Sequence, residues 1–185
     1  FYQDWPQRII IDRGPVMTKE NFKLMQKHYR RPFKCIVLLR DVMDVLASYM
    51  KWYTEEPDSF VNKYGCKNDD EKLGMIMNDQ GAVAKELKGI QNSFNHKDLC
   101  YYLKYDDLVT DPQKYIKEVY KFLEEPYYPH RFQNLQQINI NGLGYNDGAT
   151  GKNMHTIRHE IKKEYNPYIE RIPQRLKDKY GHIRF

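Results

Sequence analysis

Residues 34–40 read KCIVLLR, and residues 41–53 continue as DVMDVLASYMKWY. The first segment is an unbroken apolar run between two charged residues, which is typical of a strand covered by side chains on both faces. In the second segment apolar residues recur every three or four positions, and this spacing predicts an amphipathic helix. We therefore expect a strand that leads directly into a helix, with Arg40 at the junction.

Two more strands are predicted on either side of this unit. Residues 8–12, RIIID, predict a short buried strand, and Thr18 is a suitable cap for a helix that runs to about residue 30. Residues 99–105, LCYYLKY, predict a third strand. The pair Asp111 and Pro112 then predicts the start of another helix, because proline fits the first helical position.

Other segments are less regular. A long helix is expected over about 70–94, and short helices after Pro167 and Pro173. Residues 55–69 are predicted to form a polar loop, and residues 126–165 an irregular region. The alternation of strands and helices predicts an α/β fold, with a parallel sheet flanked by helices in a single domain over residues 1–185.

In a sheet of this kind, ligands bind beyond the carboxyl ends of the strands. Polar residues follow the apolar runs directly at all three predicted strand ends: Asp12-Arg13, Arg40-Asp41 and Tyr105-Asp106. We therefore expect the functional site where these three junctions meet.

Composition narrows the class of protein. The 185 residues carry a formal charge of +5, with 41% hydrophobic and 30% charged residues, which predicts a soluble globular protein with a preference for anionic ligands. No apolar run is long enough for a membrane helix. Basic residues are interleaved with acidic ones, so no nucleic-acid patch is expected. The three cysteines form no CxxC pair, and Cys35 and Cys100 are predicted to be buried thiols.

Arg40 and Ser48 are the candidates for binding a phosphate monoester. A guanidinium at a strand end binds two phosphate oxygens with charge-assisted hydrogen bonds, and a hydroxyl two helical turns further on donates a third. The alternative is that Arg40 pairs with Asp41 or Asp44 and that Ser48 is an ordinary surface residue. Spacing alone leaves both interpretations open.

The segment from Arg40 to Ser48 resembles the 3′-phosphate motif Arg-Asp-Pro-x-Asp-x-x-x-Ser of sulfotransferases, with Val42 in place of the proline. Residues 11–15, IDRGP, resemble the family's Glu/Asp-Lys-Ser-Pro turn, and residues 103–112, LKYDDLVTDP, its Arg-Tyr-Glu-Asp-Leu-x-x-Asp-Pro segment. Residues 151–158, GKNMHTIR, are similar to a Gly-x-x-x-His-x-x-Arg segment of some bacterial-type members. These matches lie in the family's order along the chain.

The resemblance implies a P-loop NTPase-like sulfotransferase fold and transfer of a sulfuryl group from 3′-phosphoadenosine-5′-phosphosulfate (PAPS) to a hydroxyl or amine. No metal is expected, because lysine and arginine side chains neutralise the negative charge on the sulfuryl group and its bridging oxygen during transfer. Nothing in residues 1–8 resembles the family's 5′-phosphosulfate loop, which the resemblance places in an N-terminal strand-loop-helix upstream of residue 1.

The resemblance also assigns roles to residues. Asp12 is expected to be the catalytic base, with His155 in reserve, and Arg13 to neutralise the transferring group. The alternative is that Asp12 has a structural role and holds Arg13 or the turn at Gly14. Arg40 and Ser48 are expected to bind the cofactor. So is Tyr105, at the end of the third strand. Lys152 and Arg158 are expected to bind it from a loop that folds over the nucleotide as a lid.

Two alternatives from other classes remain at this point. A P-loop kinase or related phosphotransferase shares the sheet and the strand-end arginine. A non-catalytic nucleotide- or glycan-binding module is the second. The acceptor is expected to be a small molecule, a glycan or a peptide, and the compartment the cytoplasm; the sequence leaves the oligomeric state open.

Overall fold

The computed structural model describes residues 9, 11, 14, 17–28, 33–136, 146–147, 151–152 and 157–185. All three predicted catalytic residues lie outside this set: Asp12, Arg13 and His155. The buried strand predicted at residues 8–12 is wrong at the two positions that are described. Ile9 and Ile11 belong to no strand, and Ile11 is 87% exposed.

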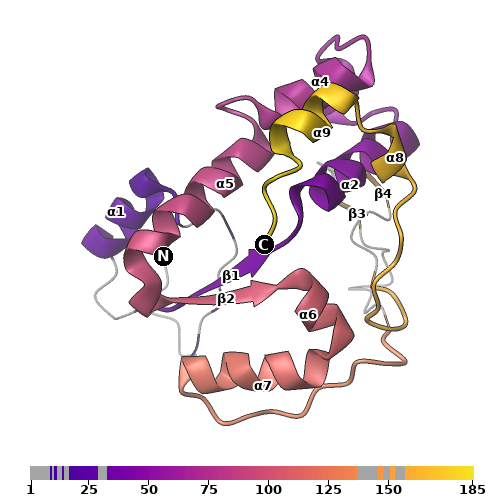
Figure 1. The fold of residues 1–185 in the computed structure, drawn as a ribbon. Coiled ribbons are helices and arrows are strands. Elements are labelled where there is room, and N and C mark those ends of the chain that lie inside the picture. The colour runs from indigo at the N-terminus through magenta and orange to yellow at the C-terminus, as the bar shows by residue number, and fades with distance from the viewer. Residues whose placement is uncertain are drawn as a thin grey trace.

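A two-stranded parallel sheet lies at the centre of the described part of the chain (Figure 1). Strand β1 (Cys35–Leu39) pairs with β2 (Cys100–Lys104), in a register that runs from Cys35 opposite Cys100 to Leu39 opposite Lys104. The two strands predicted in these places, and the α/β class, are therefore confirmed. Because the strands are parallel and in register, their carboxyl ends lie side by side.

The two faces of β1 differ in burial. Cys35, Val37 and Leu39 face a core that also holds Met17 and Phe22. The other face is open, with Ile36 45% and Leu38 52% exposed, so the predicted cover on both faces is wrong.

The helix on the open side packs against β2 instead of β1. It is α7 (Pro112–Leu123), which begins at the predicted Asp111-Pro112 pair. The Tyr101 hydroxyl of β2 donates to Glu118 at 2.6 Å, and the Tyr101 and Phe122 rings lie 5.7 Å apart. The hydrophobic run of β1 thus predicted the strand correctly, but it did not show that only one face of the strand is covered.

The larger core is helical and surrounds α2 (Val42–Glu55), the helix predicted after Arg40. Side chains of α2 pack against α4 (Asp69–Met77), α8 (Tyr168–Arg171) and α9 (Gln174–Tyr180). The two short helices predicted after Pro167 and Pro173 are confirmed. Burial is complete along this face of α2, which holds Leu46, Ala47 and Met50 at 0% exposure.

The long helix predicted over 70–94 is two helices, α4 and α5 (Ala82–Ser93). The chain turns at Gly81, where a Cβ atom would lie 2.1 Å from the carbonyl oxygen of Ile76. Any other residue would clash with backbone there, so glycine is required. A 3₁₀ helix, η1 (Phe94–Leu99), joins α5 to β2, and the predicted loop 55–69 contains the short helix α3 (Phe60–Lys63).

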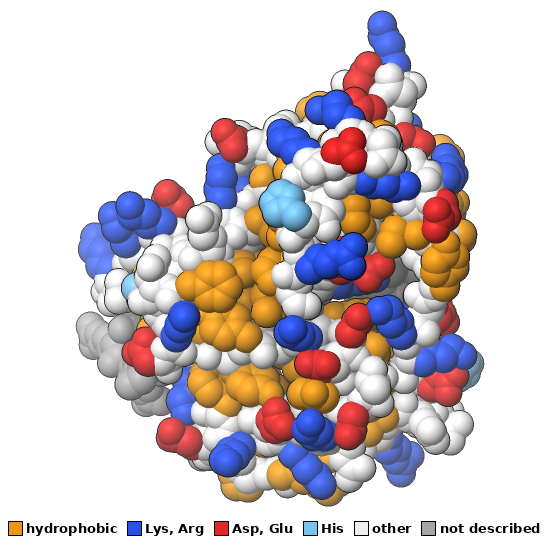
Figure 2. Space-filling model, viewed as in Figure 1, with side chains coloured by type: hydrophobic (Ala, Val, Ile, Leu, Met, Phe, Trp, Pro, Cys, Tyr) orange, Lys and Arg blue, Asp and Glu red, His pale blue; other side chains and the backbone are white. Residues whose placement is uncertain are grey.

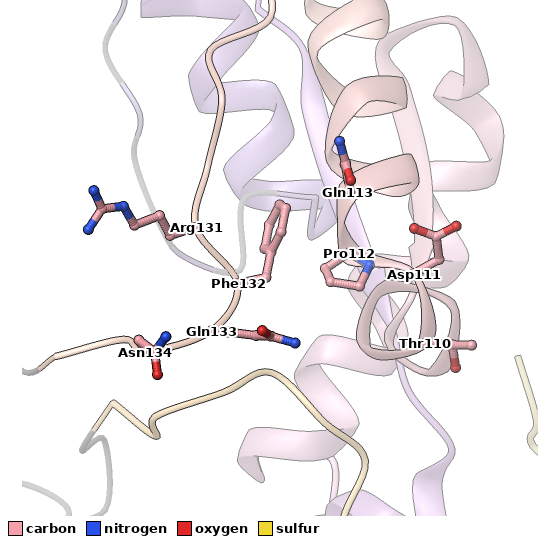
Figure 3. A pocket seen from close by; sticks show the side chains of 8 residues that line it. All are labelled: Thr110, Asp111, Pro112, Gln113, Arg131, Phe132, Gln133 and Asn134. Carbon is pink, nitrogen blue, oxygen red and sulfur yellow. The ribbon is translucent and has the colours of Figure 1, made fainter.

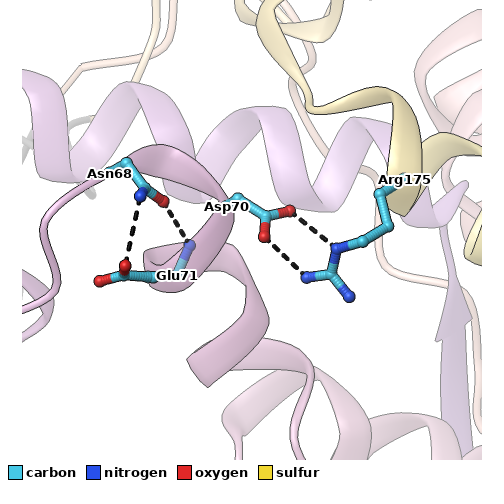
Figure 4. Close-up of polar contacts among 4 residues, drawn as sticks. All are labelled: Asn68, Asp70, Glu71 and Arg175. Carbon is cyan, nitrogen blue, oxygen red and sulfur yellow. Dashed lines mark hydrogen bonds and ion pairs between the residues drawn. The ribbon is translucent and has the colours of Figure 1, made fainter.

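Local hydrogen bonds fix where the first helices begin. Thr18 caps α1 (Lys19–His28) by accepting from the Asn21 N–H at 3.3 Å, as predicted. Asn68 accepts from the Glu71 N–H at 2.9 Å, and its amide donates back to the Glu71 carboxylate at 3.2 Å. This reciprocal arrangement fixes the start of α4 (Figure 4).

An arginine from the C-terminal segment ties α4 to α9. The Arg175 guanidinium donates two hydrogen bonds to the Asp70 carboxylate, at 3.1 and 2.9 Å (Figure 4). The bidentate geometry fixes the orientation of both side chains. The remaining elements are α6 (Tyr105–Thr110) and the two-residue strands β3 (Asn146–Asp147) and β4 (Gly151–Lys152). Within the described residues, no helix has the length and hydrophobicity needed to cross a membrane.

The predicted burial of Cys35 and Cys100 is confirmed, and it sets their reactivity. Burial, followed by the neighbouring Cys100, raises the pKa of the Cys35 thiol to about 11. Only on the order of one Cys35 in a thousand is then a thiolate at pH 8. We expect the half-exposed Cys66 to react with a disulfide reagent at least about tenfold faster than Cys35, measured by peptide mapping after timed labelling.

The raised pKa of Cys35 also makes the free energy of unfolding depend on pH in the alkaline range. The folded pKa of Cys35 lies above the reference value of 9.0, so folding favours the protonated thiol. This contribution is fully present below about pH 9 and is lost as the pH rises towards about 11. Equal labelling rates for Cys35 and Cys66 at pH 8 would contradict the burial of Cys35.

Candidate functional site

The candidate site begins where the two strands end. Leu39 and Lys104 are register partners, so the next residues, Arg40 and Tyr105, follow neighbouring strand ends. The Arg40 guanidinium lies over the Tyr105 ring, 4.5 Å from its centre. A cation–π contact of this kind holds the guanidinium in one place. The sheet therefore brings together two of the predicted cofactor-binding residues, which are 65 positions apart in the sequence.

The Arg40 Nε atom is buried and has no hydrogen-bond partner among the described residues. A buried donor that is left unpaired costs about 1–3 kcal/mol, and more when it carries charge. An anion that accepts from this guanidinium would remove that cost. The orphaned donor is thus an observation on this chain that fits a phosphate group.

Asp41, the carboxylate next to Arg40 in the sequence, has other partners. Asp41 caps α2 by accepting from the Met43 N–H at 2.8 Å, and its second oxygen lies 3.9 Å from Arg184 Nε. Within the described residues Arg40 forms no salt bridge with Asp41 or Asp44. The structure therefore does not support the alternative in which Arg40 forms an ion pair with Asp41 or Asp44. It supports the interpretation in which the guanidinium is available to a ligand.

Ser48 lies on α2, two turns from the start of that helix. Its side chain is half-buried, and its hydroxyl has no hydrogen-bond partner in the described part of the chain. The fully buried neighbours Leu46 and Ala47 hold this stretch of α2 against the core. Its contact with a phosphate stays a prediction, but the hydroxyl is free to make it.

Lys163 is a candidate that sequence reasoning missed. Its ammonium donates to the Asp106 carboxylate at 2.6 Å, and Asp106 follows Tyr105 in the first turn of α6. This hydrogen bond raises the pKa of Lys163, and the Lys163 charge also interacts with Asp44 and Arg40. Lys163 belongs to no sequence motif, because it reaches the site from an extended segment 57 residues after Asp106.

Arg184 is a second cation that the sequence did not single out. It comes near the C-terminal end of the chain and approaches the Asp41 carboxylate at the start of α2. Its neighbours Ile183 and Phe185 pack against the core around α2. Three cations from remote segments, Arg40, Lys163 and Arg184, therefore gather around the carboxyl end of β1.

Of the other predicted site residues, Asp12, Arg13 and His155 lie outside the described residues, and Arg158 has a different partner. Arg158 pairs with Glu164 at 2.7 Å and is exposed. Lys152 lies in β4 opposite Asn146, and its side chain is not described. In the described ranges no group of three or more His, Cys, Asp or Glu residues is placed to hold a metal ion.

The charges on the surface are mixed. Figure 2 shows Lys and Arg side chains alternating with Asp and Glu side chains over the face in view, without a broad region of one sign. A local cluster of cations, rather than an extended basic surface, therefore attracts an anionic ligand here. This pattern suits a small anion better than a nucleic-acid backbone.

Comparison with known proteins identifies relatives. A family model described as "Sulfotransferase domain" matches residues 13–172. A curated protein named carbohydrate sulfotransferase 3, from Tetronarce californica, is 28% identical over 126 residues. That match covers 66% of this chain and 29% of the relative, so the chain spans less than a third of the relative's length. No solved structure matches at a comparable level of significance.

Proposed function

The chain belongs to the sulfotransferase domain family, and on that premise we propose that it transfers a sulfuryl group from PAPS to a hydroxyl group of a glycan. The observation that carries the proposal is the Arg40 guanidinium. It is held on Tyr105 at the carboxyl end of the sheet, and its buried Nε lacks a hydrogen-bond partner in the part of the chain that the structure describes. The family's 3′-phosphate motif places an arginine at this position of the chain.

In this proposal Arg40 and Ser48 hold the 3′-phosphate of the nucleotide. Arg40 donates from a fixed guanidinium, and Ser48 donates from its unpaired hydroxyl. Lys163 adds a second positive group when it exchanges its Asp106 partner for a phosphate oxygen. Tyr105 shapes the nucleotide pocket because its ring keeps the Arg40 guanidinium in place. We also propose that this ring contacts the adenine directly.

PAPS, when bound, supplies the activated sulfuryl group. The proposal keeps the catalytic roles implied by the family resemblance: Asp12 takes the proton of the acceptor hydroxyl, with His155 in reserve, and Arg13 neutralises the charge on the transferring group. Lys152 and Arg158 are proposed to close over the nucleotide. The P-loop NTPase-like form of the sheet is likewise proposed from the resemblance.

The glycan acceptor comes from the relative, whose name says that it acts on carbohydrate. Incubation with labelled PAPS and a panel of desulfated glycosaminoglycans tests the reaction directly. Label is expected in the glycan in the presence of wild-type protein only. Transfer of phosphate from labelled ATP would support the kinase alternative instead, and binding of PAPS without transfer to any acceptor would support a non-catalytic module.

Lys163→Gln is expected to weaken the binding of adenosine 3′,5′-bisphosphate about two- to fivefold, because an exposed charge contributes less than about 1 kcal/mol. Isothermal titration calorimetry at low salt measures the change. The matched control is Lys162→Gln, since Lys162 is the neighbouring lysine and pairs with Glu160 at 2.6 Å. Equal affinities for the two variants would remove Lys163 from the site.

A further inference from the structure

An open hollow of about 590 Å³ lies at the junction of α6 and α7 (Figure 3). One wall is the end of α6 and the start of α7, and the other is the extended segment 131–134. Phe132 and Gln133 point from this segment towards Pro112, and Arg131 extends outward at the rim (Figure 3). The lining residues are Thr110, Asp111, Pro112, Gln113, Arg131, Phe132, Gln133 and Asn134.

Hydrogen bonds to the backbone fix both walls. The Ile161 N–H donates to the Phe132 carbonyl at 3.2 Å, and the Leu135 N–H donates to the His159 carbonyl at 2.8 Å. On the opposite wall, Asp111 accepts from the Lys114 N–H at 3.1 Å and so caps α7. Both walls of the hollow are therefore held in place before any ligand arrives, which lowers the entropic cost of binding.

A second hollow of about 460 Å³ continues from the first along α7. The two share Asp111 and Gln113, and the second also includes Lys114, Lys117 and Glu118. Together they form one elongated surface, which we call the α7 groove. An elongated groove suits a chain of several linked units better than a single small molecule.

The charges along the α7 groove are unbalanced. Lys114, Lys117 and Arg131 have no salt-bridge partner in the described part of the chain. Both carboxylates of the groove accept hydrogen bonds, Asp111 as the cap of α7 and Glu118 from the Tyr101 hydroxyl at 2.6 Å, and both also interact electrostatically with Lys114. Lys117 lies 5.3 Å from the centre of the Tyr127 ring. Three cations (Lys114, Lys117 and Arg131) against two carboxylates (Asp111 and Glu118) leave a formal net charge of +1 along the groove, which attracts an anionic ligand.

The remaining groups are those that bind sugars. The amides of Gln113, Gln133 and Asn134 donate to and accept from hydroxyl groups. Phe132 offers an apolar ring to the C–H face of a pyranose. Lysine and arginine bind carboxylate or sulfate groups through charge-assisted hydrogen bonds. Hydroxyls, apolar ring faces and negative groups occur together in one class of ligand, the acidic oligosaccharides.

The groove is also connected to the candidate site. The segment that supports its outer wall, residues 159–161, continues to Lys163, which bonds Asp106 in the first turn of α6. The groove lies at the other end of α6. A helix of six residues is about 9 Å long, roughly the length of two sugar units. A glycan in the groove can therefore extend towards the carboxyl end of the sheet.

We propose that the α7 groove binds an anionic oligosaccharide, as the part of the acceptor chain beyond its reacting hydroxyl. This inference rests on the proposed function for its role, but the binding itself needs no sulfuryl donor.

Nuclear magnetic resonance titration without nucleotide tests the binding. The probes are hexasaccharides of chondroitin sulfate, of hyaluronan and of neutral maltose units. We expect both acidic hexasaccharides to shift the amide signals of Gln113, Lys117 and Gln133. Lys117→Gln and Arg131→Gln should each weaken binding about two- to fivefold, and the double variant about tenfold, with greater losses at low salt.

Lys23→Gln on α1 is the matched control, since it removes an equal charge from an exposed position on another helix, and binding should stay unchanged. Shifts confined to other parts of the chain, equal losses for the control and the groove variants, or equal affinity for the maltose hexasaccharide would each overturn the inference. Loss of sulfuryl transfer with intact groove binding would instead count against the proposed function. The two failures are therefore distinguishable.

Discussion

Arg40→Ala is expected to weaken the binding of adenosine 3′,5′-bisphosphate at least about tenfold. Loss of a hydrogen bond to a charged group costs about 1.5–3 kcal/mol, which corresponds to roughly a tenfold change or more. The fold should tolerate the change, because the variant loses the stacking on Tyr105 but also removes a buried donor without a partner. Calorimetry gives the affinity, and thermal unfolding confirms that the variant is folded.

The matched control is Arg171→Ala. Arg171 also lies over a tyrosine, 5.0 Å from the centre of the Tyr168 ring, and it pairs with Asp69 at 3.4 Å. It is on α8, so its loss should leave the affinity for the nucleotide unchanged. An unchanged affinity in the Arg40 variant would refute the assignment of Arg40 to the 3′-phosphate. Arg40→Lys separates charge from geometry, because lysine keeps the charge but lacks the planar fork.

Leu46→Ala should lower the free energy of unfolding by about 2–5 kcal/mol, the range found when a fully buried leucine is truncated. Leu46 has no exposed surface and lies in the core around α2, two positions before Ser48. The loss follows from the transfer of fewer apolar atoms into the core and from the cavity that remains. Urea denaturation measures it, through a lower midpoint at an unchanged slope.

Leu24→Ala is the control for this substitution, since it removes the same atoms from a side chain that is 55% exposed on α1. We expect its effect to stay within about 0.5 kcal/mol. If both variants lose the same stability, the core around α2 is not packed as described. If Leu46→Ala remains folded at low temperature, its affinity for the nucleotide can be measured. A lower affinity would show that the packing of α2 against the core is needed to position Ser48.

Local patterns in the sequence predicted several elements correctly. The apolar run 35–39, the helix after Arg40, and the helix that begins at Pro112 are present as expected. Each depends on interactions within a few residues: side-chain periodicity, a capping carboxylate, or the fixed φ angle of proline. The division at Gly81 was missed, because the glycine is needed for a close approach to the Ile76 carbonyl that periodicity does not show.

The candidate site was predicted in part, for a similar reason. The spacing of Arg40 and Ser48 is local and visible in the sequence. The availability of the Arg40 guanidinium was not, since spacing alone could not separate a free arginine from one paired with Asp41 or Asp44. That distinction depends on the cap of α2, which engages Asp41, and on the Tyr105 ring from the neighbouring strand.

The sequence by itself therefore determined the strand-to-helix junction at Arg40, the α/β class and the resemblance to sulfotransferases. The tertiary structure decided which remote residues meet there. Pairing of β1 with β2 places Tyr105 beneath Arg40, and the extended segment near residue 163 places Lys163 on Asp106. Contacts between distant segments depend on how cores pack, and this packing leaves no periodic signal along the chain.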